Sequence, residues 1–100
     1  MEVKYHEDYA VLTLPEMVVI FKGADELKET LYAMCQEGIN NIVLDFTNVV
    51  MIDTAGLSSL LVYQKRLKER GGRLKVTNIT CGYIREMFDT IELHKVIDID

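Results

Sequence analysis

A threonine hydroxyl follows a carboxylate at the point where the apolar pattern of the chain changes from strand-like to helix-like. The two residues are Asp53 and Thr54. The run Ile42–Leu44 before them predicts a strand, and leucines from Leu57 onward recur every three to four residues, which predicts a helix. Free backbone N–H groups and the helix dipole make a helix N-terminus a good place to hold a phosphate. Thr54 is therefore a candidate phosphorylation site.

The same two residues also suit a purely structural role. Asp and Thr are both favoured N-caps, because their side-chain oxygens accept hydrogen bonds from the free N–H groups of the first helical turn. By spacing alone, capping by Asp53 or Thr54 is the simpler interpretation.

Cysteine and histidine chemistry has little support in the sequence. Cys35 and Cys81 are far apart, and neither has a Cys or His at the spacing of a metal site. Cys35 falls in an apolar helical stripe, which predicts a core position. His6 and His94 are isolated. No metal, cofactor or cysteine nucleophile is expected.

Two pairs of carboxylates resemble an acid–base pair only in outline. They are Asp45 with Asp53 and Asp89 with Glu92. No apolar pocket, nucleophile or metal is indicated around either pair, so the sequence does not predict an enzyme.

Length and charge narrow the domain organisation, partners and locations that remain possible for this chain. One hundred residues predict a single domain spanning 1–100. A formal net charge of −5 argues against nucleic acid as a partner. The longest apolar run, 17–21, is too short to cross a membrane, and the N-terminus shows no signal-peptide pattern, so a cytoplasmic location is expected.

The order of patterns predicts an α/β domain with parallel strands in the middle of its sheet. Gly38 and the pair Gly71–Gly72 stop the first two helices, and Thr80 is the expected cap of the third. The strand at 41–46 is apolar on successive residues, which predicts a central place and burial on both faces. The expected strands cover 2–6, 9–14, 41–46, 73–77 and 96–99, and the expected helices cover 25–37, 54–70 and 80–91.

Together these residues resemble a known family. Met51-Ile52-Asp53-Thr54-Ala55-Gly56-Leu57, the Gly71–Gly72 break, the strand at 73–77 and the segment 84–97 resemble the STAS domain of bacterial anti-sigma factor antagonists. The resemblance implies an α/β STAS fold, with a four-to-five-stranded mixed sheet and three to four helices.

The resemblance also implies a regulatory function without catalysis. Such antagonists bind an anti-sigma factor that is also a serine/threonine kinase, and so release the sigma factor. Phosphorylation of the hydroxyl after the motif's Asp switches the antagonist off, and a phosphatase resets it. In this chain the phosphoacceptor falls on Thr54 and the acidic neighbour on Asp53.

The expected partner surface surrounds that loop. The family carries a Gly-Glu-hydrophobic-Asp turn near it, where this chain has Pro15-Glu16-Met17-Val18, so Glu16 is kept and the Asp is replaced by Val18. Small residues at Ala55 and Gly56 would let a partner's backbone approach. The full set of expected contact residues is Glu16, Asp53, Thr54, Ala55, Gly56, Ser58, Ser59 and Tyr63.

Two points stay open at the level of sequence. The run Met17–Phe21 is either a buried connecting strand or an exposed apolar patch for a partner. The chain is either a phosphorylation-switched antagonist or an unswitched STAS adaptor of a transporter or stress-signalling complex, which would use Asp53, Thr54 and an exposed helix face at Ser58, Ser59 and Tyr63.

Overall fold

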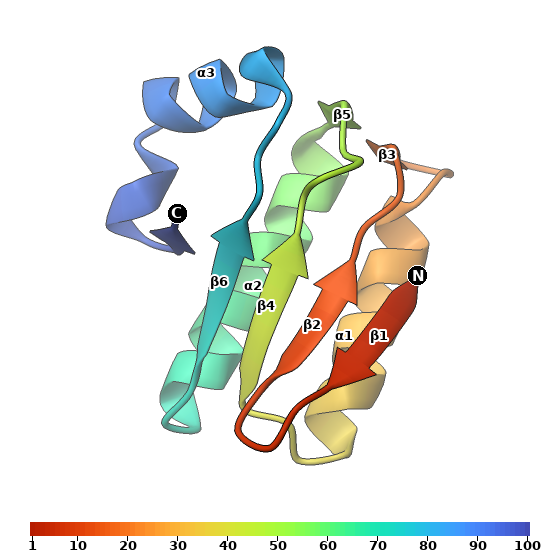
Figure 1. Cartoon of the computed structure of the whole chain (residues 1–100), viewed down its shortest axis with the longest axis vertical. Coiled ribbons are helices and arrows are strands. Elements are labelled where there is room, and N and C mark those ends of the chain that lie inside the picture. Colours follow the sequence, from red (N-terminus) through yellow and green to blue (C-terminus); the bar gives the residue numbers. More distant parts are fainter.

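A five-stranded mixed sheet forms the centre of the molecule (Figure 1). The computed structural model describes residues 1–100. The strand order is β1-β2-β4-β6-β7, with β1 antiparallel to β2 and all other neighbours parallel. The mixed sheet and central parallel strands predicted from the sequence are confirmed. The strands are β1 (Glu2–Tyr5), β2 (Ala10–Thr13), β4 (Asn41–Asp45), β6 (Arg73–Thr77) and β7 (Asp98–Ile99).

Two long helices cover one face of this sheet. In Figure 1, α1 (Ala24–Gln36) and α2 (Thr54–Glu69) lie behind the strands, and the front face carries no helix. The shorter α3 (Gly82–Thr90) lies beyond the end of β6, followed by a 3-10 turn at Leu93–Lys95. Phe88 of α3 packs edge-on against Phe46, with ring centroids 5.8 Å apart. The α/β architecture with three helices is therefore the predicted one.

The core lies between the sheet and the two helices. In β4, Ile42 and Leu44 are buried, whereas Val43 between them is only half-buried. The central position predicted for this strand is confirmed, but burial on both faces is wrong. The physical reason is that α1 and α2 both pack on the same face, so alternate residues of β4 point to an uncovered side.

Glycine residues end both long helices as predicted. Gly71 has φ +82°, a left-handed conformation that costs glycine little, and the N–H of Gly72 donates to the carbonyl of Leu67 at 2.8 Å. Gly38 has φ +85° after α1. These glycines therefore determine where the chain turns from α1 into β4 and from α2 into β6.

The predicted start of the third helix is wrong by two residues. The helix begins at Gly82 with Cys81 in the capping position, where no side chain forms a capping hydrogen bond. The hydroxyl of Thr80 instead donates to the carbonyl of Thr47 at 2.8 Å. Thr80 therefore ties the loop before α3 to the loop after β4.

A second, two-stranded sheet lies beyond the carboxyl ends of β2 and β4. Its strands, β3 (Met17–Val18) and β5 (Met51–Ile52), run parallel and pair Met17 with Met51 and Val18 with Ile52. Val18 is fully buried, as expected for a connecting strand, whereas Phe21 is 89% exposed, as an apolar surface patch would require.

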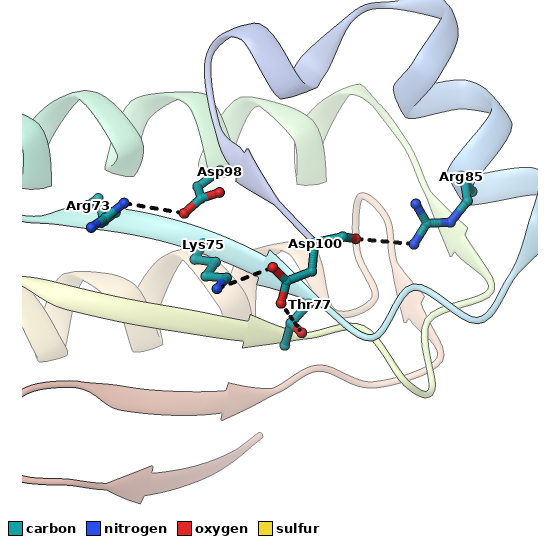
Figure 2. A network of polar contacts seen from close by, with 6 residues as sticks. All are labelled: Arg73, Lys75, Thr77, Arg85, Asp98 and Asp100. Carbon is teal, nitrogen blue, oxygen red and sulfur yellow. Dashed lines mark hydrogen bonds and ion pairs between the residues drawn. The ribbon is translucent and has the colours of Figure 1, made fainter.

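Charged side chains attach the last strand to β6 (Figure 2). Arg73 pairs with Asp98 at 3.3 Å, and Lys75 pairs with Asp100 at 3.2 Å. The hydroxyl of Thr77 also donates to the Asp100 carboxylate at 3.0 Å. These groups are largely exposed, so each pair stabilises the strand only modestly.

None of the helices has the length and apolar character needed to span a bilayer.

Candidate functional site

Asp53 caps the N-terminus of α2. Its backbone is extended, with φ −115° and ψ −171°, and its Oδ1 accepts the backbone N–H of Gly56 at 3.1 Å. Thr54 is the first residue of the helix itself. Of the two capping candidates in the sequence, Asp53 is the cap, and the exposed Thr54 is left free of that duty.

The second oxygen of Asp53 binds a distant loop. Its Oδ2 accepts the backbone N–H of Ile20 at 3.0 Å, across 33 residues of sequence. The hydrogen bond from Ile20, followed by that from Gly56, lowers the pKa of the Asp53 carboxyl below its ordinary value. Asp53 is therefore ionised at neutral pH and holds two segments together with one side chain.

The backbone brings Glu16 beside the same loop. Its carbonyl accepts the N–H groups of Val50 and Met51, at 2.8 and 3.2 Å, and its side chain is exposed. Directly after these bonds, β3 and β5 pair in parallel, and this pairing holds the two loops side by side. The predicted proximity of Glu16 to the Thr54 loop is confirmed.

Gly56 is buried against β3 and is inaccessible to a partner's backbone. A Cβ at this position would lie 2.4 Å from the carbonyl oxygen of Val18 and 2.7 Å from Cγ1 of Ile52. The close backbone approach predicted here is real, but the approaching backbone is the chain's own. Gly56 is required because only glycine lets α2 start so near β3.

The exposed helix face predicted at Ser58, Ser59 and Tyr63 is only partly correct. Ser58 is exposed, but Ser59 is 7% exposed and Tyr63 is 3% exposed. Ser59 and Tyr63 are four residues apart, so they share the face of α2 that packs toward α1. Burial raises the pKa of Tyr63, and the guanidinium of Arg66 lies 5.1 Å from its ring centre. The physical reason for the error is that the core-facing stripe of α2 includes polar residues.

A shallow groove of about 270 Å³ runs between α1 and α2 from this point. Ser59 and Tyr63 belong to its lining, together with the half-buried Ala55. Sequence reasoning missed the α1 side of this groove and the contribution of Val62, and it left open whether the run containing Ile20 is exposed. The lining residues are Ile20, Ala24, Asp25, Lys28, Ala55, Ser58, Ser59, Val62, Tyr63 and Arg66.

The carboxylates near the site are arranged for structure. Burial alone would raise the pKa of Asp45, but hydrogen bonds from Thr47 and Asn78 outweigh it and lower the pKa. A general acid at neutral pH needs a raised pKa, so neither Asp45 nor Asp53 is tuned for that task. No cluster of three or more His, Cys, Asp or Glu side chains could hold a metal ion. What the site offers is an exposed hydroxyl, beside a hydrogen-bonded carboxylate, on a capped helix N-terminus.

Similar folds occur among solved structures. A crystal structure of a Thermotoga maritima protein assigned as an anti-sigma factor antagonist has a TM-score of 0.85 at 19% identity, covering 98% of this chain and 83% of that chain. The anti-sigma factor antagonist SpoIIAA in its unphosphorylated form has a TM-score of 0.74 at 15% identity, covering 99% and 86%. At these identities the likeness shows a shared fold.

The phosphorylated form of SpoIIAA, a Bacillus cell fate determinant, is similar to the same degree. Its TM-score is 0.75 at 15% identity, with 99% of this chain and 89% of that chain covered. A comparison with curated proteins gives no significant match. The STAS domain model, however, matches the sequence from residue 1 to residue 100. The chain therefore belongs to the STAS domain family.

Proposed function

We propose that this chain is an anti-sigma factor antagonist, switched off when an anti-sigma factor kinase phosphorylates Thr54. The observation that carries the proposal is that two neighbouring residues have different roles at the start of α2. Asp53 caps the helix, so the exposed Thr54 hydroxyl beside it is not needed for capping. A residue in that position can be modified without unfolding the helix.

The expected effect of the phosphate is electrostatic. Phosphothreonine adds about −1.5 to −2 charge at neutral pH. The N-terminus of α2 favours that charge, whereas the ionised Asp53 opposes it, so the two effects on the fold partly cancel. In a complex with a kinase, the acceptor lies against the nucleotide's phosphates. A phosphate left on Thr54 would therefore be repelled there, and the complex would dissociate.

The proposed partner surface comprises the exposed and half-buried residues around Thr54. Glu16, Ala55 and Ser58 would contact the kinase directly, and the ionised Asp53 would fix the loop between them. Ser59 and Tyr63 would form the floor of the adjoining groove, while the buried Gly56 would act only by holding α2 against β3. A phosphatase would reset the switch. This role is non-catalytic, needs no cofactor, nucleic acid or membrane insertion, and makes the cytoplasm the expected compartment.

Phosphorylation with a purified anti-sigma factor kinase from the same genome tests the proposal. With ATP, intact-mass analysis should show one added phosphate on the wild-type chain and on Ser58→Ala, and none on Thr54→Val. Ser58 is the matched control because it is an exposed hydroxyl one helical turn away on the same face. Phosphate that persists in Thr54→Val would remove Thr54 as the switch.

An unswitched STAS adaptor is the second candidate. The observation in its favour is the apolar outer side of α2, where Leu61 and Val62 are each 44% exposed. An adaptor would bind its larger partner through this side without any phosphate. Thr54→Ser should then leave binding intact, Thr54→Glu should weaken it through charge, and ATP should have no effect on the complex.

A further inference from the structure

The turn between β3 and α1 presents two apolar side chains to solvent. Phe21 is 89% exposed and Ile20 is 57% exposed. We refer to these two residues as the apolar tip. Exposed aromatic side chains next to a functional loop are typical anchors of protein interfaces.

The apolar tip is held in a fixed conformation. Val19 and Lys22 exchange two backbone hydrogen bonds of 2.9 Å, and the N–H of Ala24 also donates to the carbonyl of Val19 at 3.2 Å. Phe21 has φ +63°, a left-handed conformation that is rare and unfavourable for an aromatic residue. The turn thus keeps Phe21 exposed at a conformational cost. A turn whose backbone is ordered in advance loses less entropy when it binds.

The apolar tip is also fixed to the Thr54 loop. The N–H of Ile20 donates to Asp53, the residue directly before Thr54. The side of Ile20 lines the groove that Ala55 and Ser58 also line. A protein that covers Thr54 therefore meets the apolar tip on the same surface.

The net charge of the chain disfavours two other occupants of the tip. Charges near the tip are balanced, with Lys22, Lys28, Arg66 and the amino group of Met1 against four carboxylates, but the whole chain has a formal net charge of −5. The molecule as a whole would therefore repel an anionic membrane and a second copy of the same chain. A basic protein surface would be attracted. The four carboxylates are those of Glu16, Asp25, Glu26 and Asp53, of which Glu26 also pairs with the amino group of Met1.

We propose that the apolar tip enters an apolar pocket on the kinase that phosphorylates Thr54. This inference rests on the proposed function. Phe21 is the anchor, and Ile20 extends its contact toward the groove. The tip supplies affinity that does not depend on the modified hydroxyl.

Phe21→Gly separates binding from folding. Glycine accepts a positive φ, so the variant should melt at a temperature equal to or above that of the wild type. Its affinity for the kinase that phosphorylates Thr54, measured by titration calorimetry with ADP present, should fall about 10- to 100-fold. Ile20→Ser should weaken binding less. The matched control is Tyr83→Ser, an aromatic residue 63% exposed on α3, which should bind like the wild type.

The other outcomes each overturn the inference in a recognisable way. Equal affinity of Phe21→Gly and the wild type removes the anchor and leaves the switch intact. Failure of the wild type to bind or be phosphorylated removes the proposed function and the anchor together. Sedimentation with phosphatidylcholine–phosphatidylserine vesicles, lost in Phe21→Gly, would make the tip a membrane anchor instead. A concentration-dependent dimer lost in that variant would make its partner a second copy.

Discussion

The carboxylate of Asp53 joins the start of α2 to the backbone N–H of Ile20, 33 residues earlier in the chain, at 3.0 Å. Asp53→Asn should separate its two roles. Asparagine is also a good N-cap, so Gly56 keeps its acceptor, but an amide NH2 now faces the N–H of Ile20. Amide hydrogen exchange should become about tenfold faster at Ile20 and change little at Gly56. Equal protection of Ile20 in both proteins would contradict the importance of this bond.

The close contact of α2 with β3 should make Gly56 intolerant of any side chain. In Gly56→Ala the new Cβ would be 2.4 Å from a backbone oxygen that cannot move without disturbing β3. We expect a loss of about 1–3 kcal/mol of unfolding free energy, measured in urea. The control is Gly82→Ala, also in a first helical turn, where nothing lies within 4 Å of the added Cβ. That variant should be neutral or slightly more stable.

Burial on α2 should be visible as a contrast between neighbouring positions. Tyr63 is 3% exposed, so Tyr63→Ala should cost about 3 kcal/mol through lost packing and an unfilled cavity. Ser58 is exposed, and Ser58→Ala should change stability by no more than about 0.5 kcal/mol. Thermal or urea unfolding would check both. A small effect at Tyr63 would restore the exposed helix face that the sequence suggested.

Acid should destabilise the fold through its hydrogen-bonded carboxylates. The pKa of Asp53 is lowered by N–H donors, and that of Asp45 is lowered because hydrogen bonds outweigh burial. The pKa of an Asp in the unfolded chain is about 3.9. Since the folded pKa values lie below this, the stability they contribute is complete above about pH 4 and is lost as the pH falls through the folded values.

Urea unfolding at a series of acidic pH values would measure that loss. The wild type should lose stability steadily once the pH falls below about 4. Asp45→Asn should be less stable than the wild type near neutral pH and should lose less on acidification, because one titrating group is gone. Parallel curves for the two proteins would rule out a contribution from Asp45.

A negative charge at Thr54 should alter binding and leave the fold unchanged. Thr54→Glu replaces an exposed side chain at the first position of α2, where an acid is well tolerated. Its unfolding free energy should lie within about 0.5 kcal/mol of the wild type. Its amide NMR spectrum should shift only around residues 16–23 and 50–58. Shifts spreading into β6 or α3 would instead indicate a conformational change through the domain.

The sequence predicted the three helices and the five strands of the main sheet because each of these carries a local pattern. Leu27 and Leu31 mark one helix, and Gly71–Gly72 ends another. The pairing of β3 with β5 could not be read this way, because two-residue strands have no period and depend on distant partners. Burial of β4 on both faces was predicted wrongly for a related reason. Val43 is apolar although one side of it is uncovered, and an apolar residue does not report which face a helix covers.

The sequence predicted which functional groups form the candidate site, but not which distant segments come together there. A carboxylate before a hydroxyl at a helix start identified Asp53 and Thr54 from local rules alone. Nothing local links Asp53 to Ile20, so the contact of the β3–α1 turn with the Thr54 loop was not predicted. A run of apolar residues containing Phe21, just before the glycine at 23, was the one available signal. Ser59 and Tyr63 were placed on the wrong face because polar residues in a core-facing stripe resemble a solvated side.

The two-stranded sheet of β3 and β5 makes the surface around Thr54 discontinuous in sequence. Residues 16–23 and 50–58 come together only after both strands have paired and Gly56 has packed beneath them. A partner that needs both segments recognises a three-dimensional epitope and would pass over a short peptide containing Thr54. Only a folded domain would then be modified at the hydroxyl. Unfolded or truncated chains would therefore take no part in the regulation.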